Sequence, residues 1–232
     1  MRDLTKRFGG LAAVAGLSFD IRAGELLGVI GPNGAGKTTL FHLVTGFHRP
    51  SSGEVRFEGR TITGLRPHAV CRLGIARTFQ IVQPFPGLTV LANAMIGAFN
   101  RTREPAAAEA AARSVLGVVG LSAKAGHEAR TLTLSERKRL EVARALATGP
   151  RVLLLDEVMA GLTAAEVHDA VELVKRIQAR GVACVVVEHV MEGIMPIADQ
   201  ILVLDYGRKI AQGTPTQVRN DPAVIAAYLG ES

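Results

Sequence analysis

A glycine-rich motif at residues 31–38, GPNGAGKT, constrains the fold more than any other part of the chain. Its spacing matches G-x-x-x-x-G-K-[ST], after an expected strand and before a helix expected from Lys37 to about Thr45. In that setting backbone N–H groups curl around phosphate oxygens, and the helix N-terminus adds positive potential. We therefore predict that Lys37 reaches the β and γ phosphates of ATP and that Thr38 holds Mg²⁺. The residues expected to bind the nucleotide are Asn33, Gly34, Ala35, Gly36, Lys37, Thr38 and Thr39.

The composition favours an α/β fold. The chain has 232 residues, of which 48% are hydrophobic, so it is long enough to bury a core unaided. Aromatic residues make up only 4% and Trp is absent, so the core must consist of Leu, Val, Ile and Ala, as the interiors of parallel sheets often do.

Several classes of protein are excluded by what the sequence lacks. No apolar run approaches the roughly 18 residues that span a bilayer, and the opening MRDLTKRFGG is followed by no long apolar stretch of a secretory signal. Cys71 and Cys184 lie far apart without a partner motif, which favours a reducing compartment and a cytoplasmic protein. The net charge of +6 is spread over the chain without dense basic runs, so no nucleic-acid partner is expected.

The order of the expected elements predicts a sheet interrupted by a helical segment. A helical pattern runs from residue 88 to about 119 and is followed by helices at 135–148 and 163–180. The remaining strands are expected at residues 53–59, 75–80, 151–157 and 182–189, with a hairpin at 200–213.

Two carboxylates end the apolar stretch RVLLLDE at residues 151–157. In an open parallel sheet, ligands bind at the carboxyl ends of the strands. Asp156 is expected to support Mg²⁺, and Glu157 to polarise the attacking water as general base. Alone, such a pair is more often a solvated turn, but together with the phosphate loop it indicates ATP hydrolysis.

Two further polar residues close expected strands. His189 ends VACVVVEH, where its ring could bond a γ-phosphate and sense its presence. Gln80 ends IARTFQ and offers an amide oxygen for Mg²⁺ or the attacking water. Each residue alone is more often structural, and the prediction rests on the whole set.

The order Lys37, Gln80, Asp156 with Glu157, and His189 resembles the nucleotide-binding subunit of ATP-binding-cassette (ABC) transporters over nearly the whole chain. The resemblance implies a single P-loop NTPase domain over residues 1–232. Its core has a mixed or parallel sheet with an antiparallel β subdomain, at about residues 1–80 and 150–232, and a helical subdomain is inserted at about residues 81–149.

The segment that grips the partner subunit's ATP in this family, L-S-G-G-Q, is altered here to residues 132–136, LTLSE. Thr133 keeps the hydroxyl, Ser135 replaces a glycine, and Glu136 replaces the glutamine. A carboxylate close to a triphosphate should repel it, so we expect Glu136 to point toward Arg137 or Lys138.

Two other positions are read from the same resemblance. Thr163 stands where the family usually has Asp or Asn in the loop that crosses the dimer interface. Phe8 is the candidate for stacking on adenine, with Val14 behind it, although a core role for Phe8 is nearly as plausible. The first strand also starts closer to Met1 than is usual, which we interpret as a truncated or misassigned start.

Within the family, RTFQ and the closing AYLG look like the ATPases of branched-chain amino-acid importers. This implies an ATPase on the cytoplasmic face of the inner membrane, paired with an identical or sister ATPase subunit and with membrane permeases, and served by a periplasmic solute-binding protein. The cargo would be branched-chain amino acids or related small polar solutes such as amides, urea or aromatic acids. Phe85, Pro86 and Leu88 are candidates for the permease contact, with a role in the core as the alternative.

Two other functions are compatible with an ABC ATPase. One is a soluble ATPase acting on nucleic acid or ribosomes, but the tandem cassettes or long coiled coils of such proteins are missing from the sequence. The other is a binding-only regulatory subunit, against which Glu157 and His189 argue.

Overall fold

The computed structural model describes residues 1–79 and 84–229. At its centre lies a six-stranded sheet with the order β11-β10-β3-β9-β8-β7. Neighbouring strands are parallel except for β11, which pairs antiparallel with β10. The strands span Arg208–Gly213 (β11), Gln200–Asp205 (β10), Leu26–Ile30 (β3), Ala183–Val187 (β9), Val152–Asp156 (β8) and Ile75–Arg77 (β7).

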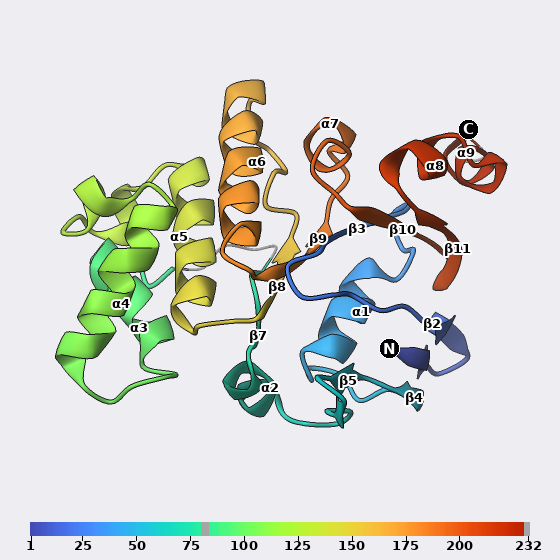
Figure 1. Cartoon of the computed structure of the whole chain (residues 1–232), viewed down its shortest axis with the longest axis horizontal. Coiled ribbons are helices and arrows are strands. Elements are labelled where there is room, and N and C mark those ends of the chain that lie inside the picture. The colour runs from blue at the N-terminus through green and yellow to red at the C-terminus, as the bar shows by residue number, and fades with distance from the viewer. Residues whose placement is uncertain (80–83, 230–232) are drawn as a thin grey trace.

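The central strands are apolar runs because both faces of the sheet are covered. Figure 1 shows α6 (Ala164–Gln178) and α7 (Met191–Ile194) on one face and α1 (Lys37–Val44) on the other. Successive residues of a strand point to opposite faces. In β8, for example, Leu153 and Leu155 enter the cluster on the α6 side, and Leu154 enters the cluster around α1.

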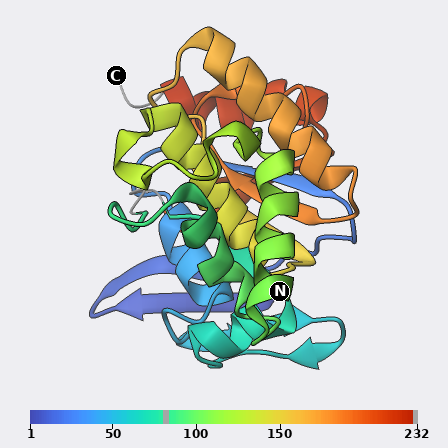
Figure 2. The same ribbon diagram turned by 90° about the vertical axis from the view of Figure 1, so that its left-hand side faces the viewer.

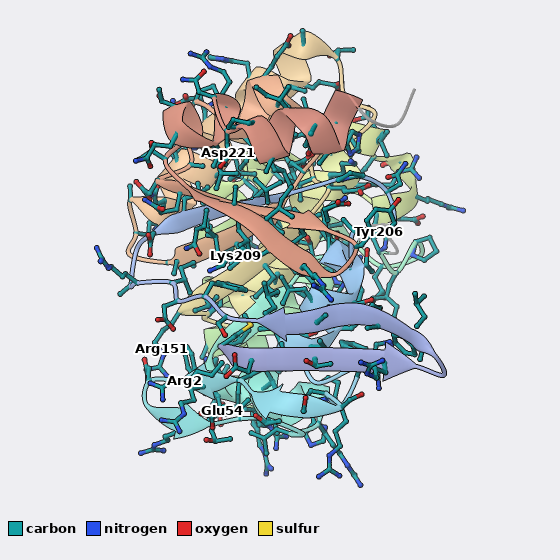
Figure 3. The ribbon with its side chains drawn as sticks, turned by 90° about the vertical axis from the view of Figure 1, so that its right-hand side faces the viewer. Arg2, Glu54, Arg151, Tyr206, Lys209 and Asp221 are labelled. Atoms are coloured by element: carbon teal, nitrogen blue, oxygen red, sulfur yellow. The ribbon has the colours of Figure 1, made fainter. Side chains whose placement is uncertain are left out.

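An antiparallel layer packs beside the core. Its three-stranded sheet has the order β2-β1-β4, formed by Leu11–Leu17, Arg2–Phe8 and Ser52–Glu54. A short pair, β5 (Arg56–Phe57) and β6 (Arg60–Thr61), precedes α2 (Pro67–Leu73). Figure 3 views this layer below the C-terminal helices α8 (Pro215–Arg219) and α9 (Pro222–Leu229).

A helical lobe packs beside the core, on the left in Figure 1 and facing the viewer in Figure 2. It contains α3 (Val90–Ala98), α4 (Pro105–Val118) and α5 (Leu134–Ala147), with short 3₁₀ turns at Ser122–Lys124 and Ala129–Thr131. The stretch from residue 88 to about 119, where the sequence shows a helical pattern, contains the two helices α3 and α4. Pro105 starts α4 at its first turn and disfavours helical backbone before it.

The predicted α/β fold, with a mixed sheet, antiparallel strands and a helical insertion, is confirmed. Within the described residues, none of the helices is both long enough and apolar enough to cross a bilayer.

Candidate nucleotide site

The residues singled out in the sequence gather at one edge of the central sheet. The phosphate loop follows β3, His189 follows β9, and Asp156 ends β8, and these three strands are adjacent and parallel. Tyr206 follows β10 and lies at the same edge of the sheet. Arg151 precedes β8 and lies at the opposite edge, so the two residues are far apart in Figure 3. The site is therefore built where the carboxyl ends of parallel strands meet.

The phosphate loop depends on glycine because neighbouring backbone presses against it. A Cβ on Gly36, which has a φ of 100°, would lie 2.4 Å from the carbonyl oxygen of Ala13 in β2. A Cβ on Gly31 would lie 2.1 Å from the carbonyl oxygen of Leu204 in β10. The Gly207 N–H also donates to the Ala35 carbonyl oxygen at 3.0 Å, so two strands far apart in sequence hold the loop in shape.

Lys37 is folded back onto this loop. Its Nζ donates to the carbonyl oxygens of Gly31 at 2.6 Å and Pro32 at 2.8 Å, and the residue is only 9% exposed. Burial lowers the pKa of Lys37, while Glu157 and Asp156 act in the opposite direction. An ammonium group has three donors, so one N–H remains for a phosphate oxygen.

The other predicted loop residues differ in exposure. Asn33, Gly34 and Thr38 are exposed, Gly36 and Thr39 are half-buried, and Ala35 is buried. The Thr38 hydroxyl is thus accessible to a ligand at the start of α1.

Asp156 is held in place at the end of β8 by two groups from the neighbouring strand segment. Its Oδ2 accepts from Arg77 Nη2 at 2.9 Å, and its backbone N–H donates to Thr78 Oγ1 at 3.0 Å. Burial raises the pKa of Asp156, and the Arg77 guanidinium counteracts that rise. Arg77 was not foreseen from the sequence as a site residue, although it is the first residue of the RTFQ segment.

Glu157 adopts a left-handed backbone conformation with a φ of 51°. For a residue with a side chain this costs roughly 1–2 kcal/mol. The turn is held because the Glu157 N–H donates to the Val187 carbonyl oxygen at 2.9 Å and its own carbonyl accepts from Lys138 Nζ at 2.9 Å. Lys138 also donates to the Ala160 carbonyl oxygen at 2.5 Å, so α5 supports the loop that carries the expected base.

His189 lies beside Glu157, with 3.9 Å between its Nδ1 and Glu157 Oε1. Its side chain is 59% exposed. The preceding Glu188 is wholly buried, and its Oε1 accepts from the Met159 N–H at 2.7 Å. Gln80, the remaining residue predicted at this edge, lies outside the described residues.

The donor set fits Mg²⁺. Thr38 supplies a hydroxyl oxygen and Asp156 a carboxylate, and the described residues contain no group of three or more His, Cys, Asp or Glu that would suit another metal. Mg²⁺ is usually held by one or two protein oxygens together with phosphates and water.

The altered signature segment forms the start of α5. Thr133 is the N-cap: its Oγ1 accepts from the Glu136 N–H, and Glu136 Oε2 accepts from the Thr133 N–H. Glu136 also pairs with Lys124, and the hydrogen bond from Lys124 lowers the pKa of Glu136. Ser135 is buried in the first turn.

Glu136 pairs with Lys124, and the prediction that it points toward Arg137 or Lys138 was wrong. Arg137 Nε donates instead to the Leu132 carbonyl oxygen at 3.0 Å, and Lys138 points to the loop after β8. The carboxylate is turned toward Lys124, within the helical lobe, because the capping box fixes Glu136 at the helix start.

Phe8, Val14 and Thr163 are the remaining residues that the resemblance singled out. Phe8 is 45% exposed, with its ring 5.3 Å from that of His48 and Lys6 Nζ 4.9 Å from its centroid. Val14, expected behind Phe8, is wholly buried. Thr163 is the N-cap of α6 and forms a capping box with Glu166.

Comparisons with known proteins agree with this geometry. The sequence matches the family model described as ABC transporter over residues 14–160, and that of the branched-chain amino acid ATP-binding cassette transporter over residues 208–232. The high-affinity branched-chain amino acid transport ATP-binding protein BraF of Pseudomonas aeruginosa is 39% identical, covering 99% of this chain and 96% of that protein. LivG of Salmonella typhimurium, with the same description, is 38% identical over 100% and 97% of the two chains.

A solved structure has the same fold. The crystal structure of an ATP-binding cassette of an ABC transporter in its ADP conformation has a TM-score of 0.90 and 31% identity, covering 99% of this chain and 97% of that one. The resemblance found in the sequence is confirmed: this chain belongs to the ABC transporter family and is one of its ATPase cassettes.

Proposed function

We propose that this chain hydrolyses Mg²⁺–ATP to power an importer of branched-chain amino acids or of related small polar solutes such as amides, urea or aromatic acids. The observation that carries the proposal is the convergence of Lys37, Asp156 and Glu157 at one edge of the sheet, beside the phosphate loop. The names of the relatives support the transported class.

The proposed reaction is the transfer of the γ-phosphoryl group to water. The loop N–H groups and the third donor of Lys37 would bind the phosphates, and Glu157 would accept the proton of the attacking water. His189, exposed beside Glu157, would bond the γ-phosphate. Bound Mg²⁺, held by Thr38 and Asp156, would neutralise charge on the β and γ oxygens.

We further propose that two ATPase subunits, identical or sister, close head to tail on two nucleotides. Thr133, Ser135 and Glu136 at the start of α5 would then face the partner's ATP. The pair between Glu136 and Lys124 supports this arrangement, because it neutralises a carboxylate that would otherwise repel the triphosphate.

A groove of about 310 Å³ between the core and the helical lobe is our candidate site for a cytoplasmic segment of a permease. Phe47, Phe79 and Ile96 line it, and each is at least 40% exposed. The nearby Phe85 is 47% exposed, and Pro86 and Leu88 are also exposed, so these side chains are available for such a contact. In this proposal the chain lies on the cytoplasmic face of the inner membrane, and a periplasmic solute-binding protein acts only through the permease.

Uptake of labelled leucine, urea, an amide and an aromatic acid tests the proposal in cells that lack the chain. The cells are complemented with wild type, Glu157→Gln, or Glu172→Gln, a surface control on α6 whose side chain is 46% exposed. Wild type and the control should restore uptake of one solute class, and Glu157→Gln should not. Dependence of no solute on the chain would contradict the transport function, even if the purified protein hydrolyses ATP.

A further inference from the structure

Arg77 is a buried cation in direct contact with the expected metal ligand. Its side chain is 6% exposed, and its Nη2 lies 2.9 Å from Asp156 Oδ2, whose side chain is 2% exposed. Arg77 Nε also donates to the Thr78 carbonyl oxygen at 3.2 Å. The Asp156 carboxylate is thus held by Arg77 through Oδ2.

Three aromatic rings lie close to the same guanidinium. Its Cζ lies 4.7 Å from the ring centroid of Phe79, 5.6 Å from that of Phe47 and 5.8 Å from that of Phe41. Such distances are typical of a cation over aromatic faces. Phe47 and Phe79 also touch each other edge to face, with centroids 5.8 Å apart.

Two of these rings form part of the groove surface. Phe47 is 48% exposed and Phe79 is 42% exposed, and both line the groove together with Arg77. Phe41, by contrast, is a wholly buried residue of α1. One planar group therefore lies close to two groove-lining rings and also donates to the carboxylate at the end of β8.

Only part of the guanidinium is held by hydrogen bonds. Its Nη1 is buried and has no hydrogen-bond partner among the described residues. Of its two terminal nitrogens, only Nη2 is therefore tied to an acceptor among the described residues, while Nε donates to the Thr78 carbonyl oxygen. Displacement of Phe47 or Phe79 would move the nitrogen that holds Asp156.

We propose that Arg77 is a positioning residue that sets the Asp156 carboxylate for Mg²⁺ and links it to Phe47 and Phe79 in the groove. The proposal rests on the proposed function, because it assumes that Asp156 supports the metal of a bound nucleotide. Arginine suits this role better than lysine, since only a planar guanidinium can stack on rings while donating in its plane.

The test measures how strongly Mg²⁺ increases the affinity for nucleotide. This readout does not depend on ATP hydrolysis. The dissociation constant of a fluorescent ATP analogue is measured in Mg²⁺ and in EDTA for wild type, Arg77→Met, Arg77→Lys, Phe79→Ala and Phe99→Ala. The ratio of the two constants is the Mg²⁺ enhancement. Phe99 is the matched control, because its ring is 46% exposed and it is not among the residues that line the groove around Arg77.

Arg77→Met should reduce the Mg²⁺ enhancement by about tenfold while leaving the EDTA affinity close to that of wild type. Arg77→Lys should recover part of the loss, Phe79→Ala should shift the enhancement in the same direction by a smaller factor, and Phe99→Ala should leave it unchanged. Binding of Mn²⁺ in the presence of the analogue, followed by the loss of the free-ion EPR signal, should weaken in the same order.

Other results would overturn the proposal. An equal loss of affinity with and without Mg²⁺ in Arg77→Met would assign Arg77 a purely structural role, and equal effects of Phe79→Ala and Phe99→Ala would remove the link to the groove. If Arg77→Met does not fold, Arg77→Lys and Phe79→Ala carry the test. Failure of wild type to bind the analogue under either condition would instead contradict the proposed function.

Discussion

Lys138 of α5 donates from its Nζ to the backbone carbonyl oxygen of Glu157 at 2.9 Å, although the two residues lie on different structural units of the chain. A second bond from the same ammonium group reaches the Ala160 carbonyl oxygen. Lys138 thus ties the helix that begins with the altered signature segment to the loop that carries the expected general base.

Lys138→Met is expected to lower kcat by about ten to a hundredfold with little change in KM, because the Glu157 carboxylate loses its exact placement. Lys138→Arg should recover part of the rate. The matched control is Lys175→Met, which removes an exposed lysine paired with Glu172 on α6. Equal effects of Lys138→Met and Lys175→Met on steady-state ATP hydrolysis would contradict the positioning role.

Lys124 is expected to shield the partner subunit's nucleotide from Glu136. Lys124→Met leaves that carboxylate without its ion-pair partner and should weaken ATP-driven dimerisation, measured by light scattering in the Glu157→Gln background. Glu136→Gln retains the capping-box geometry and should dimerise at least as well as the parent.

The double variant Lys124→Met with Glu136→Gln completes a double-mutant cycle. It should dimerise as well as Glu136→Gln alone, since no charge remains to be neutralised. If Lys124→Met weakens dimerisation to the same extent in both backgrounds, the lysine does not act through Glu136.

Glu188 is expected to make the protein less stable as the pH rises. Burial raises the pKa of Glu188, while the hydrogen bond from the Met159 N–H lowers it. A carboxyl group with a raised pKa in the folded state contributes stability below the unfolded-state pKa, and that contribution is lost as the pH rises through the folded-state pKa. Glu188→Gln keeps an acceptor for Met159, so its stability relative to wild type should increase between pH 5 and pH 8.

Urea denaturation at several pH values measures this difference. Glu192→Gln, on the short helix α7, serves as the control and should show no comparable trend. A difference between Glu188→Gln and wild type that is constant across this range would show that Glu188 does not change its ionisation on folding.

The elements that could be predicted from the sequence are those defined by local pattern. The motif at residues 31–38 lies between β3 and α1 as expected, and the apolar runs at β8 and β9 are buried strands whose carboxyl ends carry Asp156 and His189. These features follow from spacing and hydrophobicity within a few neighbouring residues.

The contacts that tune the site could not be predicted in the same way. Arg77 and Asp156 are 79 positions apart, and their pairing depends on β7 lying next to β8 at the edge of the sheet. The orientation of Glu136 was predicted wrongly, because the choice among nearby cations is decided by the capping box and the turn at Ser122–Lys124. Such choices depend on tertiary packing and not on position along the chain.

Glu157 is proposed to act as the base of an ATPase that closes as a pair. The most direct test is the mass of the purified Glu157→Gln protein in ATP and Mg²⁺, determined by light scattering, beside its steady-state ATP hydrolysis and that of wild type. We expect wild type to hydrolyse ATP, and we expect Glu157→Gln not to hydrolyse it but to accumulate as an ATP-bound dimer. Binding of ATP by both proteins with neither dimerisation nor hydrolysis would contradict the proposal, and would indicate a regulatory subunit whose site is completed by another chain.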